Sequence, residues 1–105
     1  MIYAILFFMN LLKDIQLKIA QNMQFLKETF HVKELGVFGS TVRGEATPQS
    51  DVDILVEFSS PIGFFDFIRL EDFLSKLLGK KVDLVCKKAL KAVIKEDILK
   101  EVSYV

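Results

Sequence analysis

The stretch from Val37 to Val56, VFGSTVRGEATPQSDVDILV, constrains the fold more than any other part of the chain. A short apolar run ends at Gly39-Ser40, ten residues follow, and Val52, Ile54 and Val56 then recur at every second position. Alternation with a period of two is typical of a β-strand. The stretch therefore predicts two short strands, Glu34 to Phe38 and one that begins near Asp51, with no more than one helical turn between them.

The flanking segments have the spacing of helices. Apolar residues recur every three or four positions over residues 12–30, 64–78 and 90–100, and Gly79 ends the second of these patterns. We expect a third strand at Val82 to Cys86 and a short extended tail over residues 102–105. This order predicts an α+β fold in which a small mixed sheet of three to four strands is backed by helices.

The length fits one domain that spans residues 1–105. Residues 1–9 are strongly apolar but too few to cross a bilayer. They form either a buried or partner-facing helix start or an extension ahead of a true start at Met9, for which Asn10 is a suitable N-cap. Cys86 is the only cysteine, so an internal disulfide is excluded and a soluble, cytoplasmic protein is expected.

The charges balance overall but are unevenly distributed. Fourteen basic residues match fourteen acidic ones, so the chain has no strong field that would attract a nucleic-acid backbone, and direct nucleic-acid binding is not expected. Between Glu34 and Phe73, however, eight acids face only Arg43 and Arg69. An acidic middle segment suits the binding of a cation.

Gly39 and Ser40 are candidates for binding a phosphate. A glycine lets backbone N–H groups approach an anion, and a serine hydroxyl at the start of a helical turn adds a further donor. A Gly-Ser step is also common in ordinary turns, so this pair alone is weak evidence.

Three aspartates are candidates for binding a metal ion. Asp51 and Asp53 point to the same face of the second strand, and Asp83 lies on the strand that should neighbour it. Hard cations such as Mg²⁺ are held by a few carboxylates together with phosphate oxygens, and a cation would offset the repulsion among three acids. Arg43 is the arginine near this site, and it either contacts phosphates or pairs with one of these acids.

Together, Gly39-Ser40, ten intervening residues and Asp51-Val52-Asp53 form a GS-x10-DxD signature, with Asp83 as a later third carboxylate. The chain thereby resembles the DNA polymerase beta-like nucleotidyltransferases. Over residues 12–105 it looks like their minimal nucleotidyltransferase (MNT) group, through GSTVRGEATPQSDVDILVEF and PIGFFDFIRLEDFLSKLLGKKVDLV. Members of that group are often encoded beside a HEPN-domain RNase toxin, act as its antitoxin, and in some cases transfer AMP from ATP to a tyrosine of the toxin.

The resemblance implies a role for each candidate residue. Asp51, Asp53 and Asp83 would be catalytic and would bind two Mg²⁺ ions, and Asp83 could accept the proton of the attacking hydroxyl. Gly39, Ser40 and Arg43 would bind the phosphates of ATP. The resemblance thus implies a Mg²⁺-dependent adenylyltransferase whose partner is a HEPN toxin.

Other functions remain open at this point. The chain could neutralise its partner by binding alone, with an interface built from residues 1–12 and the Phe-rich segment near Phe64. It could modify a small molecule such as an aminoglycoside, or an RNA end, although it lacks a domain to grip either. It could also be a catalytic half that needs a separately encoded helical subunit to supply the acceptor.

Overall fold

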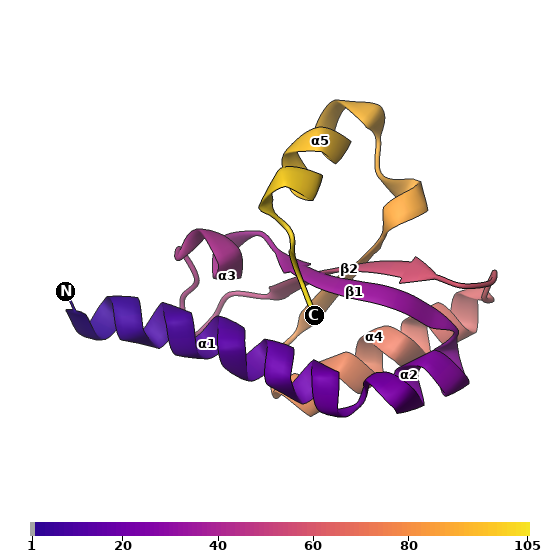
Figure 1. The fold of residues 1–105 in the computed structure, drawn as a ribbon, viewed down its shortest axis with the longest axis horizontal. Coiled ribbons are helices and arrows are strands. Elements are labelled where there is room, and N and C mark those ends of the chain that lie inside the picture. Colours follow the sequence, from indigo (N-terminus) through magenta and orange to yellow (C-terminus); the bar gives the residue numbers. More distant parts are fainter. Residues whose placement is uncertain (1) are drawn as a thin grey trace.

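The computed structural model describes the backbone of residues 2–105 and the side chains of residues 10–105. A four-stranded sheet in the order β3-β2-β1-β4 lies at the centre. As Figure 1 shows, α1, α2 and α4 cover one face of this sheet, and α5 stands over the other. The strands are β1 (Val32–Phe38), β2 (Val52–Phe58), β3 (Val82–Cys86) and β4 (Ser103–Tyr104). The predicted α+β fold with a small mixed sheet is confirmed.

The helices largely follow the predicted periodicity. They are α1 (Ile2–Gln21), α2 (Met23–Phe30), α3 (Ser40–Arg43), α4 (Phe64–Leu78) and α5 (Ala92–Glu101), with a 3₁₀ turn, η1, at Lys87–Ala89. Gly79 ends α4 in the left-handed conformation, with φ of 65°, as predicted.

The first helical segment differs from the prediction in two ways. The expected helix over residues 12–30 is two helices, because the chain breaks at Asn22, whose side-chain amide donates to the Lys18 carbonyl at 2.9 Å. Asn10 is not an N-cap, since α1 runs through it from Ile2. The prediction about an apolar extension concerns residues 1–9, whose side chains are not among those described, and for Met1 the backbone is not described either.

The core lies between the sheet and the three helices that cover one of its faces. Leu35, Val37, Ile54 and Val56 on the strands are fully buried, and they pack in one cluster with residues of α1, α2 and α4. The helix residues in that cluster are Ile15, Ile19, Leu26, Phe30, Leu70, Leu74 and Leu78. Burial of each large aliphatic side chain contributes about 1.5–3 kcal/mol, so this cluster fixes the frame on which the site is built.

Helix α4 also covers the outer edge of β3. The Val82 N–H donates to the Ser75 hydroxyl at 3.0 Å, and the Leu84 N–H donates to a Glu71 carboxylate oxygen at 3.0 Å. Side chains of the helix therefore take the place that a further strand would occupy beside these two groups.

The C-terminal segment is fixed across β1. Gly36 and Val37 pair with Tyr104 and Ser103, and the Gln16 side-chain amide donates to the Ser103 hydroxyl at 2.8 Å. A Cβ at Gly36 would stand 2.7 Å from Val102 Cγ1, so the absence of a side chain there lets the segment lie close to the sheet.

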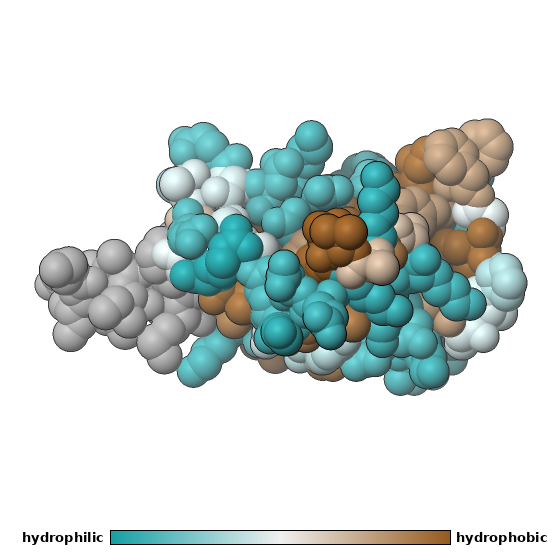
Figure 2. Space-filling model, turned by 90° about the horizontal axis from the view of Figure 1, so that it is seen from above, coloured by the Kyte–Doolittle hydropathy of each residue, from teal (hydrophilic) through white to brown (hydrophobic). Residues whose placement is uncertain are grey.

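Helix α5 and the start of α4 expose apolar side chains. Val93 on α5 is 88% exposed, and Phe64 and Phe65 at the start of α4 are 71% and 75% exposed. Seen from above, Figure 2 shows hydrophobic surface at the end of the molecule opposite the grey N-terminal segment, where α4 begins. Among the helices of residues 2–105, none combines the length and apolar character needed to span a bilayer.

Candidate active site

The turn after β1 depends on Gly39. This residue precedes α3 with φ of 77° and ψ of −150°, a conformation that is essentially restricted to glycine. Ser40 is the first residue of α3, and the first N–H groups of a helix have no carbonyl of the same helix to bond to. The structure thus places Gly39 and Ser40 where N–H donors are available to an anion.

The Asp53 carboxylate lies directly against Gly39. Asp53 pairs with Phe38 across the two antiparallel strands, and a Cβ built on Gly39 would stand 2.1 Å from Asp53 Oδ2. The missing side chain therefore has a second purpose that the sequence did not reveal. It leaves room for the acid beside the turn.

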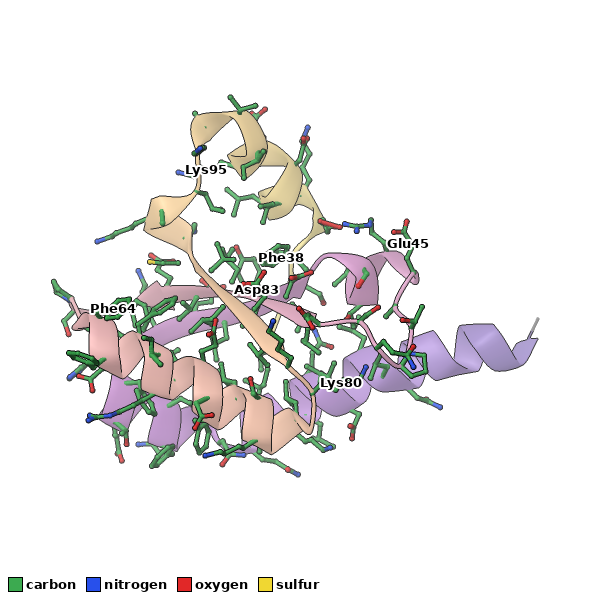
Figure 3. All side chains as sticks on the ribbon, turned by 180° about the vertical axis from the view of Figure 1, so that it is seen from behind. Phe38, Glu45, Phe64, Lys80, Asp83 and Lys95 are labelled. Atoms are coloured by element: carbon green, nitrogen blue, oxygen red, sulfur yellow. The ribbon has the colours of Figure 1, made fainter. Side chains whose placement is uncertain are left out.

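Asp53 and Asp83 lie side by side on parallel strands. They are register partners of β2 and β3, and neighbouring strands of a sheet are about 4.8 Å apart. Asp51 immediately precedes β2, is exposed, and has Lys81 Nζ at 3.9 Å from its carboxylate. Asp83 lies on β3, an edge strand of the sheet, and Figure 3 shows it well away from Phe64 at the start of α4. The prediction that β3 neighbours the Asp51–Asp53 strand is confirmed.

The three acids influence one another electrostatically. The pKa of Asp53 is raised above its usual value, first by partial burial and then by the charges of Asp83 and Asp51. Arg43 acts in the opposite direction, and Glu101 adds to the rise. A half-buried acid with negative neighbours is stabilised by a nearby cation.

The donor set suits a hard cation, but the three acids are not gathered tightly. Within residues 10–105, no group of three or more His, Cys, Asp or Glu side chains is close enough together to hold a metal ion as it stands. Asp53 and Asp83 supply adjacent carboxylates, and Asp51 lies two residues from Asp53. Oxygen donors of this kind, on a site with excess negative charge, fit Mg²⁺ rather than a soft metal.

Arg43 pairs with two glutamates and not with one of the three aspartates, which was one of the two alternatives that the sequence left open. Its Nε donates to Glu45 at 3.1 Å, and its Nη1 donates to Glu101 at 2.5 Å. These hydrogen bonds, with Glu101 first, raise the pKa of Arg43 above its ordinary value. Glu101 was missed from the sequence because it lies 58 residues from Arg43 and belongs to no local motif.

A hollow of about 470 Å³ lies elsewhere, at the far end of β2 and β3. Its walls are mainly apolar, and include Phe58, Ile62, Phe64 and Phe67 together with Cys86. Cys86 is half-buried there. None of the three aspartates lines this hollow.

Comparisons with known proteins identify the family. The model of the "Nucleotidyltransferase domain" family matches residues 18–105. Protein adenylyltransferase MntA of Thermococcus cleftensis is 49% identical over 94 residues, which cover 90% of this chain and 95% of that protein. A solved minimal nucleotidyltransferase is 35% identical with a TM-score of 0.68, over 79% of this chain and 85% of that one.

Two solved toxin–antitoxin structures share the fold at lower identity. One, with AMP-PNP, is 22% identical with a TM-score of 0.70, over 85% of this chain and 70% of that one. The other is an MNT antitoxin in complex with a tri-AMPylated HEPN toxin of Shewanella oneidensis. It is 20% identical with a TM-score of 0.62, over 86% of this chain and 70% of that one.

The matched family model covers most of the chain, and its region contains the glycine turn and the paired aspartates. The predicted family is confirmed, and with it the enzyme class. The chain belongs to the nucleotidyltransferase domain family, within its minimal group, and is a nucleotidyltransferase.

Proposed function

We propose that this nucleotidyltransferase transfers AMP from ATP to a hydroxyl of a HEPN-domain RNase toxin and so acts as the antitoxin of that partner. The observation that carries the proposal is the register pairing of Asp53 with Asp83 beside Gly39. A MntA adenylyltransferase relative and an AMPylated HEPN toxin bound to an MNT antitoxin support the choice of reaction and partner.

The carboxylates would hold the metal ions of the reaction. Asp51, Asp53 and Asp83 offer oxygen ligands for two Mg²⁺ ions, whose chemistry there is to neutralise phosphate charge and to lower the pKa of the attacking hydroxyl. Binding a cation would relieve the repulsion that raises the pKa of Asp53. A bound cation would therefore offset the destabilising repulsion among the three carboxylates.

The remaining residues would bind and orient the nucleotide. N–H groups at Gly39 and Ser40, with the Ser40 hydroxyl, would bind the β- and γ-phosphates, and Arg43 would offset charge that develops during displacement. Asp83 is exposed and would accept the proton of the acceptor hydroxyl, which we propose is a tyrosine. The new bond joins that oxygen to the α-phosphorus, and pyrophosphate leaves.

The direct test first looks for a HEPN reading frame beside this gene and then uses the protein that such a frame encodes. Intact-mass measurement of that protein, after incubation with this chain, ATP and Mg²⁺, should show the mass of one or more AMP groups. Asp53→Asn should reduce the transfer rate by at least about 10²-fold, since it removes a charged group at the reacting centre. Asp72→Asn is a matched control, because Asp72 makes only a surface pair with Lys76 on α4.

One structural observation favours a second candidate, an antitoxin that acts by binding alone. Phe64, Phe65 and Val93 expose apolar surface that a partner protein could cover. Toxin neutralisation in cells that persists with Asp51→Asn and Asp53→Asn would favour this second function. Loss of neutralisation in these variants, with partner binding intact, would favour catalysis.

A further inference from the structure

Glu101, the last residue of α5, forms a hydrogen bond with Arg43, which lies one helical turn after Gly39. Its carboxylate accepts a hydrogen bond from Arg43 Nη1 at 2.5 Å, although the two residues are 58 positions apart. The Glu101 side chain is 19% exposed, whereas that of Glu45, the other partner of Arg43, is 62% exposed. The Glu101 bond is therefore the better shielded of the two, and the stronger.

The backbone that carries Glu101 is fixed on the sheet. Ser103, two residues after Glu101, is the first residue of β4, and this strand pairs with β1. The Ser103 hydroxyl also accepts a hydrogen bond from Gln16. Val102, in between, packs over Gly36. Glu101 thus projects from a fixed point, while Arg43 is long and half-exposed and would otherwise sample many rotamers.

Among the side chains of residues 10–105, Arg43 bonds to Glu45 and Glu101, and its other donors bond to none of them. A guanidinium has five N–H donors in one plane, of which Glu45 takes the Nε–H and Glu101 takes one on Nη1. Because the group is planar, the better shielded contact with Glu101 is sufficient to restrict the direction of the other donors. Arg43 is the last residue of α3, which begins directly after Gly39, and Gly39 lies against the Asp53 carboxylate. The guanidinium is therefore carried by the same short turn that contacts the acid.

We propose that Glu101 is a positioning residue that holds the Arg43 guanidinium at the site, so that its free N–H donors meet the phosphates of ATP. This inference rests on the proposed function, in which Arg43 contacts those phosphates. Holding the side chain in place before ATP arrives removes the entropy cost of ordering it. Such a cost corresponds to about a two- to tenfold change in affinity per long side chain.

The test measures ATP binding by calorimetry, with AMP-PNP as the probe so that turnover does not interfere. Arg43→Ala should weaken binding by about ten- to a hundredfold, as expected when a charged hydrogen-bond donor is lost. Glu101→Ala should weaken it by about two- to tenfold, and the isosteric Glu101→Gln by less. Glu45→Ala is the matched control, because it removes the exposed partner and should change affinity less than twofold.

A double variant separates positioning from a merely structural role. If Glu101 acts through Arg43, then Arg43→Ala with Glu101→Ala should bind the probe no more weakly than Arg43→Ala alone. Additive losses, an unchanged affinity for Glu101→Ala, or tighter binding by that variant would each overturn the inference. Tighter binding would mean that Glu101 holds Arg43 away from the nucleotide.

Failure of the inference about Glu101 and failure of the proposed function give different experimental results. Wild-type protein that binds AMP-PNP with the expected coupling, but does not add AMP to the HEPN protein, would retain the role of Glu101 and contradict the proposed acceptor. Melting curves of each variant without nucleotide show whether the fold is retained. Glu101→Gln keeps the shape of the side chain, so it supports the comparison even if Glu101→Ala is unstable.

Discussion

Replacing Gly39 with alanine should damage both the fold and the chemistry, for two separable reasons. At φ of 77° and ψ of −150°, an alanine costs about 1–3 kcal/mol of backbone strain. Its Cβ would also stand 2.1 Å from Asp53 Oδ2 and 3.0 Å from Asp53 Cγ. The Asp53 side chain is short, so it can relieve this overlap only by moving its carboxylate out of the position that it occupies beside the turn.

Gly79→Ala is a matched control for the backbone cost. Gly79 also has positive φ, at 65°, but a Cβ there would meet nothing within 4 Å. We expect a loss of about 1–2 kcal/mol, which lowers the melting temperature by roughly 4–8 °C per kcal/mol, with AMP transfer unchanged. Gly39→Ala should lose at least as much stability and should reduce the transfer rate by about 10²-fold or more.

Two measurements test whether Gly39 makes room for the Asp53 carboxylate. Melting temperature and AMP transfer to the HEPN protein are compared for both variants and wild type. In an Asp53→Ala background, Gly39→Ala should cost less stability than in wild type, because the overlapping carboxylate is gone. A Gly39→Ala enzyme that transfers AMP within twofold of the wild-type rate would refute the reasoning that the glycine makes room for the acid.

Three further predictions concern stability. The folded-state pKa of Asp53 lies above its ordinary value of 3.8, so without divalent cation the contribution of Asp53 to stability should fall as pH rises from about 4 through that folded pKa. Asp53→Asn should therefore be the more stable protein in urea at pH 7, and a less stable variant would contradict this sign. Mg²⁺ with AMP-PNP should raise the melting temperature of wild type more than that of Asp53→Asn, and equal shifts would place the cation elsewhere. Leu74→Ala should cost about 2–5 kcal/mol in urea denaturation because Leu74 is fully buried, and a loss below about 1 kcal/mol would contradict the packing described.

Local sequence signals predicted the frame of the site. The period-two pattern from Val52 and the spacing between Gly39 and Asp53 indicate a strand, a turn and a second strand, and the structure contains all three. Asp83 could be placed because a small mixed sheet leaves few positions for a third apolar strand. The helix that ends at Gly79 was predictable for the same local reason.

Features that depend on contacts distant in sequence could not be predicted. Asn22 breaks the first helix through its bond to the Lys18 carbonyl, yet the apolar period continues across the break and hides it. Arg43 could not be assigned its partner, because Glu101 is brought to it only when β4 pairs with β1. The overlap that a Cβ at Gly39 would make with Asp53 follows from strand register, which a single sequence does not specify at that precision.

The side chains of α4 that cover β3 have a consequence for how a partner is recognised. Many protein pairs associate by adding a strand of one molecule to the sheet of the other, which relies on backbone groups that carry no sequence information. Here Ser75 and Glu71 already accept the outward N–H groups of Val82 and Leu84. A partner cannot extend the sheet past β3 without displacing them, so selectivity at this side of the molecule rests on side chains.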